Sequence, residues 1–276
     1  MKNFYIIISE NANVSVQNTK KKLIERFRSY GESVRFDVYE GYLGRDFQIP
    51  SDVDCVITVG GDGTMLRAAR AAFGRPVAFI GINRGHMGYL TEVSEISDFD
   101  TLTERLVNDD FQIEERMMLA ARVRRKGRNV FRDFALNDVL LGKNDSVHMM
   151  EYEVYVNGTL LNTYRADGVV VSSPTGSTGY SLSAGGPIAS PSAKLLILTP
   201  ICPHAINTRS IVLSAGDKVR IVPVSDHLLV SCDGADGTEV RAGDEVIVTR
   251  SSHAMRFIRL KEASFLDTLR DKMRVV

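Results

Sequence analysis

The hydrophobic residues in the first third of the chain form short continuous runs, separated by segments with helical spacing. The runs predict strands at residues 4–9, 33–38, 55–59 and 77–80. The segments between them predict helices at residues 16–30 and 65–72. Strands that are apolar throughout and alternate with helices are typical of a parallel sheet with both faces covered. We therefore predict an α/β N-terminal domain with a parallel sheet over residues 1–115.

From about residue 111 the pattern changes to many short strands, separated by turn residues such as Asn157-Gly158. This pattern predicts a mostly antiparallel, β-rich C-terminal domain over residues 116–261. The predicted strands are 117–124, 130–141, 152–156, 159–165, 168–172, 195–199, 218–223, 228–233, 245–250 and 256–260. Ser264 and Asp267 resemble a helix capping box, so we expect a last helix at about 262–276 that packs back on the first domain.

The segment between the strand at 55–59 and its helix reads Gly60-Gly61-Asp62-Gly63-Thr64. Glycine lets a phosphate approach the backbone, and the first N–H groups of a helix are unpaired donors, so the segment is typical of an anion site. Asp62 would repel a phosphate, and its carboxylate therefore indicates work on a hydroxyl group or a metal ion, as in phosphoryl transfer. The simpler interpretation is a tight turn that needs glycine for its φ angles. A second glycine-rich loop, at 81–89, is expected to line the same crevice.

Two segments of the β-rich domain also carry residues suited to binding. Asn137 and Asp138 interrupt an otherwise apolar strand, where unpaired polar groups are costly to bury. They indicate a binding position, or else a β-bulge or a strand end. Residues 174–187 lie between two predicted strands and are rich in glycine and hydroxyl groups. Their N–H groups and small side chains suit hydrogen bonding to a ribose or a phosphate, and Tyr180 offers an aromatic face.

Composition and charge exclude several classes of protein. Lys+Arg and Asp+Glu both number 34, and the resulting net charge of zero gives no nucleic-acid footprint. The basic run at 122–128 is interpreted as a solvated hairpin turn rather than a polyanion patch. The 3 cysteines lie far apart, which argues against a disulfide framework and a zinc site. No apolar run is long enough for a signal peptide or a membrane span, so we expect a cytoplasmic protein without nucleic-acid or membrane partners.

In combination, these motifs resemble those of the NAD kinase family. The matching segments, in order, are 60–64, 85–89, 137–138, 167–168 and 174–180. The resemblance covers roughly residues 50 to 240. The GGDG segment is shared with diacylglycerol kinases, sphingosine kinases and phosphofructokinases, whereas the PTGST segment is highly specific.

The resemblance implies transfer of the γ-phosphoryl group of ATP, or of polyphosphate in some members, to the 2′-hydroxyl of the adenosine ribose of NAD. It also implies Mg²⁺ or another divalent cation, an α/β N-terminal domain, a β-rich C-terminal domain, and a homodimer or homotetramer. No residue is assigned as a metal ligand.

By the same resemblance, Asp62 is the expected proton acceptor. The residues expected to contact NAD or ATP are Gly60, Gly61, Gly63, Thr64, Tyr89, Asn137, Asp138, His148, Arg165, Asp167, Thr178, Gly179, Tyr180, Ser181, Leu182 and Ser183. The chain departs from the family pattern at Asp138, where many members have Glu, and at Gly179, where Ala is common. Ala235 stands where Gln is frequent and cannot supply that amide.

Two other functions stay open. The first is a lipid or sugar kinase that shares the GGDGT loop, although lipid kinases generally need a membrane-facing apolar surface, for which there is no amphipathic candidate. The second is a non-catalytic NAD(P)-binding sensor that kept the fold without the reaction. Asp62 argues against a sensor, because binding alone gains little from a carboxylate beside a phosphate.

Overall fold

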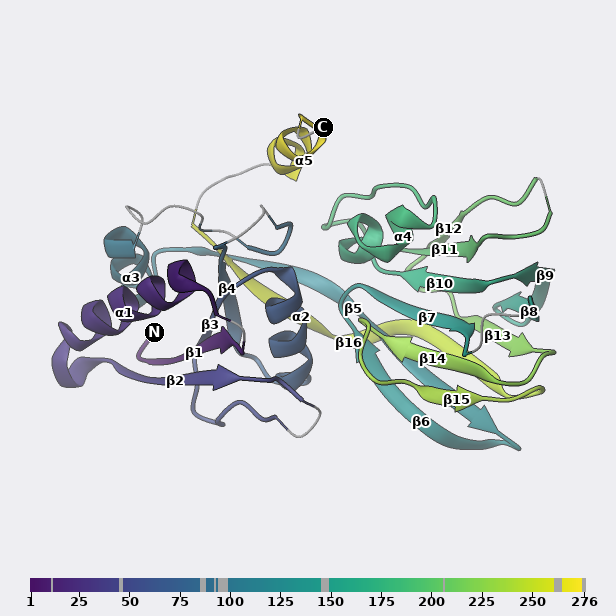
Figure 1. Ribbon diagram of the computed structural model, residues 1–276, viewed down its shortest axis with the longest axis horizontal. Coiled ribbons are helices and arrows are strands. Elements are labelled where there is room, and N and C mark those ends of the chain that lie inside the picture. Colours follow the sequence, from purple (N-terminus) through teal and green to yellow (C-terminus); the bar gives the residue numbers. More distant parts are fainter. Residues whose placement is uncertain are drawn as a thin grey trace. The chain divides into compact units, whose positions relative to one another are not determined.

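The chain folds into two compact units (Figure 1). The computed structural model describes residues 1–10, 12–44, 47–84, 88–91, 93, 99–144, 149–205, 207–260 and 265–274. The first unit comprises Met1–Glu115 and Met255–Val276, and the second comprises Arg116–Ala254. Two long strands, β5 (Gln112–Arg125) and β16 (Glu245–Arg259), contribute residues to both units.

The first unit is built on a parallel sheet with the strand order β2-β1-β3-β4, and the end of β16 pairs in parallel with β4. Its strands are β1 (Asn3–Ser9), β2 (Arg35–Gly41), β3 (Cys55–Val59) and β4 (Ala78–Ile82). Every residue of β3 and β4 is buried, which explains why these strands read as continuous apolar runs. The predicted α/β class of this part of the chain is confirmed.

Helices cover both faces of this sheet. They are α1 (Val14–Arg28), α2 (Asp62–Ala71) and α3 (Phe99–Val107). The unit also contains the short 3₁₀ helix Gly31–Ser33 and α5 (Phe265–Arg274). Leu23 of α1 and Leu102 of α3 belong to the same buried cluster as Ile57 of β3. The next residue, Thr58, points to the opposite face, where Met65 of α2 lies with its sulfur 3.8 Å from the Thr58 hydroxyl. None of the helices in the described residues is long and apolar enough to cross a membrane.

The second unit is a sandwich of two mainly antiparallel sheets. One sheet has the strand order β12-β11-β10-β7-β14-β15, and the other has the order β16-β13-β8-β9, with β5 pairing β16 and β6. The strands are β6 (Arg128–Ala135), β7 (Asp138–Lys143), β8 (Met150–Val156), β9 (Thr159–Ala166), β10 (Gly168–Ser172), β11 (Leu195–Ile201), β12 (Ile211–Ser214), β13 (Val219–Pro223), β14 (Leu228–Cys232) and β15 (Thr238–Val240). A 3₁₀ turn (Thr175–Thr178) and the short helix α4 (Tyr180–Ser183) follow β10. The predicted antiparallel, β-rich class is confirmed.

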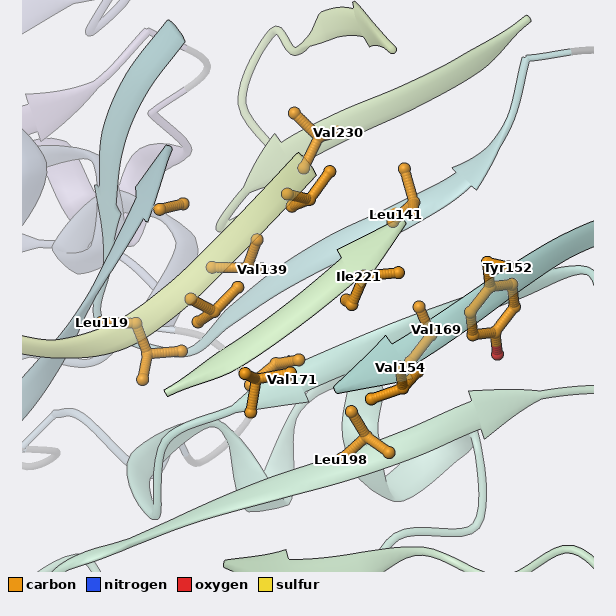
Figure 2. Packing of buried hydrophobic residues seen from close by; sticks show 14 of the residues in the cluster. Leu119, Val139, Leu141, Tyr152, Val154, Val169, Val171, Leu198, Ile221 and Val230 are labelled. Atoms are coloured by element: carbon orange, nitrogen blue, oxygen red, sulfur yellow. The ribbon is translucent and has the colours of Figure 1, made fainter. Parts of the chain in front are cut away.

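The core of the second unit lies between its two sheets (Figure 2). Val139, Val169 and Leu198 come from one sheet, and Tyr152 comes from the other. The Tyr152 hydroxyl donates a hydrogen bond of 3.1 Å to the backbone carbonyl of Gly168, so the single polar atom of this buried ring has a partner. Residues that alternate along each strand therefore meet in a continuous apolar layer.

The prediction of one strand over residues 130–141 is wrong. β6 ends at Ala135 and β7 begins at Asp138, and the two strands belong to different sheets. The break has a physical cause, because the backbone N–H groups at this point are hydrogen-bonded to the side chain of Asp233 instead of to a neighbouring strand. Asn137 and Asp138 thus mark a strand end and a corner, one of the alternatives open from the sequence.

Other boundaries also differ from the predictions. The predicted strands 245–250 and 256–260 form one strand, β16, because the backbone stays extended through the exposed polar residues Ser252 and His253. Helix α2 begins at Asp62, three residues before the predicted start at 65, so Asp62 belongs to the first helical turn. The short elements α3, β12, β15 and α4 were not predicted, since so few residues carry little periodicity.

Replacing Leu198 by alanine should lower the free energy of unfolding by about 2–5 kcal/mol, because the change leaves a cavity in the sandwich core. The same substitution at Leu160, which is 51% exposed on β9, should change it by less than about 0.5 kcal/mol. Urea unfolding followed by circular dichroism measures both. Equal effects of the two substitutions would contradict this core.

Candidate functional site

The glycine-rich loop of the first unit leaves the carboxyl end of β3, and α2 starts within it. Gly61 is the N-cap of α2, and because no side chain caps this helix, N–H groups of its first turn stay available to an anion. The Gly60 N–H donates to the carbonyl of Ile82, the last residue of β4, over 2.9 Å. A Cβ atom at Gly60 would lie 2.8 Å from the Thr64 hydroxyl, so this close approach requires glycine. The loop lies where ligands bind in open α/β sheets.

The carboxylate of Asp62 is held by the loop that follows β4. Its Oδ2 accepts the Tyr89 N–H over 2.8 Å, and its Oδ1 accepts the Leu90 N–H over 3.2 Å. A Cβ atom at Gly88 would lie 2.0 Å from Asp62 Oδ1, so only glycine fits there. Residues 85–87 of the predicted loop lie outside the described residues. Two backbone hydrogen bonds therefore orient the carboxylate and leave it further lone pairs to accept a proton.

Helix α5 contacts the same loop through Tyr89. The Lys272 ammonium lies 3.9 Å from the centre of the Tyr89 ring, and the ring of Phe265 lies 6.5 Å from it, centre to centre. Burial, and then the negative charge of Asp62, raise the pKa of Tyr89. Burial lowers the pKa of Lys272, whereas Asp62 opposes that shift. The helix thus brings a positive charge into the electrostatic environment of Asp62, which no local sequence signal indicated.

In the second unit, Asn137 and Asp138 lie at the corner between β6 and β7. Asp138 is opposite Ser172 at the end of β10 and is 7% exposed. Three buried side-chain atoms near this corner have no hydrogen-bond partner among the described residues, namely Asn137 Oδ1, Ser172 Oγ and Thr175 Oγ1. Buried polar groups are almost always hydrogen-bonded, so a cluster of unpartnered ones indicates a place that a polar ligand completes.

The turn after β10 packs directly on Asn137. The Ser173 N–H donates to the Asn137 carbonyl over 2.8 Å, and a Cβ atom at Gly176 would lie 2.1 Å from the same oxygen. A Cβ atom at Gly179 would lie 3.4 Å from the Asn137 amide nitrogen. Only glycine at Gly176 allows this approach, and Gly179 leaves space beside the Asn137 side chain.

Some hydroxyl groups of this turn fasten the turn itself. The Ser177 hydroxyl donates to the Pro174 carbonyl over 2.7 Å and accepts the Ala189 N–H over 3.0 Å. The Thr178 hydroxyl donates to the Thr175 carbonyl over 3.3 Å and stays partly exposed. The hydroxyl-rich segment is therefore a rigid turn in which only part of the hydroxyl groups face outward.

The residues of α4 divide between the inside and the surface. Ser181 is buried, and its hydroxyl lies 3.5 Å from that of Thr199 on β11. Tyr180, Leu182 and Ser183 are exposed. A ligand in front of this short helix would meet the ring of Tyr180 and the side chain of Leu182, whereas Ser181 anchors the helix to the sheet.

The structure does not bring Arg165 and Asp167 to the same corner. Asp167 pairs with Lys143, whose ammonium lies 2.8 Å from its carboxylate, and Arg165 is exposed. Asp167 precedes Ser172 by five residues along β10, which corresponds to about 16 Å in an extended strand. His148 lies outside the described residues.

The surroundings of Asp138 disfavour the ionised form of its carboxyl group. Burial, and then the charge of Asp233, raise its pKa from 3.8 to about 7. Because the folded state favours the protonated form, this carboxyl stabilises the fold fully below about pH 3.8, and its contribution is lost as the pH rises through about 7. From the sequence, Asp233 is expected at the end of the predicted strand 228–233, in the segment that contains Ala235, and no role is assigned to it. The signal for its conformation is the Asp-Gly pair at 233–234, typical of a left-handed turn.

The described residues contain no group of three or more His, Cys, Asp or Glu side chains that could hold a metal ion.

Models of two protein domains match most of the chain. The ATP-NAD kinase N-terminal domain matches residues 7–111, and the ATP-NAD kinase C-terminal domain matches residues 136–260. The NAD kinase of Lachnospira eligens is 38% identical over 295 residues, which cover 99% of this chain and 100% of that protein. The NAD kinase of Heliobacterium modesticaldum is 47% identical over 223 residues, covering 80% of this chain and 78% of that protein.

Two solved structures share the fold. A crystal structure of yeast NADH kinase complexed with NADH has a TM-score of 0.87 and 22% identity, covering 100% of this chain and 87% of that chain. An NAD kinase from Archaeoglobus fulgidus in complex with ATP has a TM-score of 0.79 and 23% identity, covering 99% of both chains. At these identities the likeness is one of fold.

Replacing Gly176 by alanine should destabilise the second unit by about 1–3 kcal/mol, because the added methyl group would meet the Asn137 carbonyl at 2.1 Å. Gly216 provides a matched control, since a Cβ atom there meets nothing closer than 3.9 Å. Its replacement by alanine should change the free energy of unfolding by less than about 0.5 kcal/mol. Urea titration of both variants measures the two free energies of unfolding. A Gly176→Ala protein as stable as the Gly216→Ala control would contradict the close approach of Gly176 to the Asn137 carbonyl.

Proposed function

The chain belongs to the ATP-NAD kinase family, and we propose that it phosphorylates NAD with ATP, using Asp62 as the proton acceptor. Membership in the family makes it a transferase of the kinase type that acts on NAD and binds ATP. The named relatives do not favour a lipid kinase, a sugar kinase or a non-catalytic sensor. The observation that carries the proposal is a carboxylate held by two backbone amides at the carboxyl end of β3.

The reaction joins the γ-phosphoryl group of ATP to the 2′-hydroxyl of the adenosine ribose of NAD. A ribose hydroxyl is a poor nucleophile at neutral pH, and a carboxylate within hydrogen-bond reach contributes about 10²–10⁴-fold as a general base. Asp62 takes the proton as the oxygen attacks phosphorus, and the bond from phosphorus to the bridging oxygen of ADP breaks. The hydrogen bonds from Tyr89 and Leu90 support this role because they orient the carboxylate.

Alignment and charge neutralisation supply the larger part of the rate enhancement. The uncapped N-terminus of α2 offers N–H groups to the phosphates, and the Lys272 ammonium supplies positive charge next to Tyr89. We propose that Gly61 and Gly63 offer their backbone N–H groups to the phosphates, where glycine suits close approach of the ligand. The N–H groups of Gly60 and Thr64 donate to the carbonyls of Ile82 and Gly61, so we propose that these two residues contact the ligand through other atoms.

We also propose a requirement for Mg²⁺ or another divalent cation. Mg²⁺ keeps several waters and is bound by one or two carboxylates together with substrate phosphates. The described residues contain no group of three or more side chains that could hold a metal ion. This composition fits a cation that arrives with ATP. When bound, it supplies neutralisation of the phosphate charge, while this chain's own residues bind, orient and accept the proton.

The second unit is proposed to hold the dinucleotide. Asn137 Oδ1 is a buried acceptor without a partner, and Asp138 lies beside it, so hydroxyl groups of a ribose would complete this corner. We propose that the segment from Thr178 to Ser183 lines the same region. Arg165 and Asp167 would contact a different part of the ligand, because they lie at the other end of β10.

We further propose that the protein works in the cytoplasm as a homodimer or homotetramer. The family resemblance supports this assignment.

The direct test is NADP formation by the purified protein with NAD, Mg²⁺ and ATP, read with an NADP-specific dehydrogenase. A steady signal that needs all three components is expected. Polyphosphate in place of ATP tests the other donor. Binding of NAD without any turnover would favour a non-catalytic sensor. If the protein does not bind NAD, lipids and sugars would be tested as phosphoryl acceptors.

Asp62→Asn should lower kcat by about 10²–10⁴-fold while NAD still binds, because the amide cannot accept the proton. Asp54 provides a matched control, since its carboxylate also accepts two backbone N–H groups, from Lys2 and Asn3, but precedes β3. Asp54→Asn should leave kcat within about twofold. Steady-state kinetics and calorimetry separate the effects, and unchanged turnover of Asp62→Asn would rule out its role as the base.

Asn137→Ala should weaken NAD binding by roughly threefold to tenfold, the equivalent of one hydrogen bond, and should leave kcat nearly unchanged. Asn129, exposed on β6, serves as the control, and its replacement by alanine should alter neither value. Calorimetric titration with NAD measures the affinity. An unaltered affinity of Asn137→Ala would count against its role in holding the dinucleotide.

A further inference from the structure

Asp233 follows β14 directly and occupies an unusual backbone conformation. Its φ of 51° lies in the left-handed region, where Asp and Asn are the best tolerated residues after glycine. Its own N–H donates to the Asp138 carbonyl over 3.0 Å, and the turn is closed by a hydrogen bond of 3.0 Å from the Ala235 N–H to the Cys232 carbonyl. The turn lies beside the start of β7, because Cys232 at the end of β14 pairs with Val139.

The side chain of Asp233 accepts backbone hydrogen bonds that a neighbouring strand would otherwise accept. Its Oδ2 accepts the Leu136 N–H over 2.8 Å, and its Oδ1 accepts the N–H groups of Asn137 over 2.8 Å and of Asp138 over 3.1 Å. These three residues are the place where the chain leaves one sheet and enters the other. One carboxylate therefore fixes the backbone of both residues that are proposed to hold NAD.

We propose that Asp233 is a positioning residue of the dinucleotide site, which holds Asn137 and Asp138 in the geometry that binds NAD. This inference rests on the proposed function, because it takes those two residues to be the ones that contact the dinucleotide. Asp233 acts through them and need not touch the ligand. Its negative charge gives it a second effect that a purely structural residue would lack.

That second effect concerns the charge on Asp138. β10 contributes the neutral Ser172 opposite Asp138, and the residue that follows β14, Asp233, contributes a carboxylate. Burial and the nearby Asp233 charge raise the pKa of Asp138 to about 7. Ribose hydroxyl groups donate best to the ionised carboxylate, so the KM for NAD should fall as the pH rises through this midpoint.

Asp233→Asn is the decisive variant, because asparagine tolerates the left-handed conformation, removes the charge and replaces one acceptor oxygen by an NH2 donor. We expect the KM for NAD at pH 8 to rise on the order of tenfold, with a much smaller change in kcat, since a single neutral acceptor holds the N–H groups of residues 136–138 less firmly than the carboxylate does. We also expect the midpoint of the pH profile of KM to move to lower pH, because the like charge is gone. Burial of Asp138 remains, so the midpoint should stay above the ordinary range of Asp.

Asp226→Asn is the matched control. Asp226 precedes β14, and its carboxylate accepts the Ala242 N–H over 2.9 Å, so the same chemical change is made at the other end of the strand. This variant should leave the KM for NAD and its pH midpoint unchanged. In an Asp138→Asn background, Asp233→Asn should no longer move any midpoint, because the titrating group has been removed.

The outcomes separate the inference from the function on which it rests. If the wild-type protein forms no NADP, the proposed function is wrong, and this result does not depend on any variant. If the wild type is active but Asp233→Asn changes neither the KM nor its midpoint, Asp233 is not a positioning residue. Should Asp233→Asn fail to fold, carbon-13 NMR titration of wild-type Asp138 replaces it, and an ordinary carboxyl pKa there would equally overturn the inference.

Discussion

In each unit, one carboxylate accepts the backbone N–H groups at a point where the chain leaves a sheet. Asp62 accepts two of them from the loop after β4, and Asp233 accepts three between β6 and β7. Backbone N–H groups at such points have no strand as a partner, and burying them unpaired is costly. The carboxylates satisfy that requirement and at the same time place a carboxylate group beside the residues that are proposed to bind the ligands.

The glycines of both units follow from the same constraint. Gly88 and Gly176 lie where a Cβ atom would meet Asp62 or the Asn137 carbonyl at about 2 Å. Neither position needs glycine for flexibility; each needs it because another group occupies the space. The few buried polar atoms left without partners in the described residues, such as Asn137 Oδ1, are the ones that we propose a ligand completes.

The sequence was informative where structure is local and uninformative where it depends on distant partners. The buried runs of β3 and β4, and the glycines after β3, could be read directly because each depends on neighbouring residues. The break between β6 and β7 could not, since its acceptor, Asp233, is 95 residues from Asp138. The contact of Lys272 with Tyr89 depends on where the last helix docks. The distance between Asp167 and Asn137 follows from the length of β10, which the motif order does not reveal.

A crystal structure of the protein with NAD bound tests the central claim most directly. The account predicts that the 2′-hydroxyl of the adenosine ribose lies about 2.6–3.2 Å from a carboxylate oxygen of Asp62, with both amide hydrogen bonds to that carboxylate intact. A bound NAD whose 2′-hydroxyl faces another ionisable group, with Asp62 out of reach, would contradict the assignment of the base and the mechanism built on it.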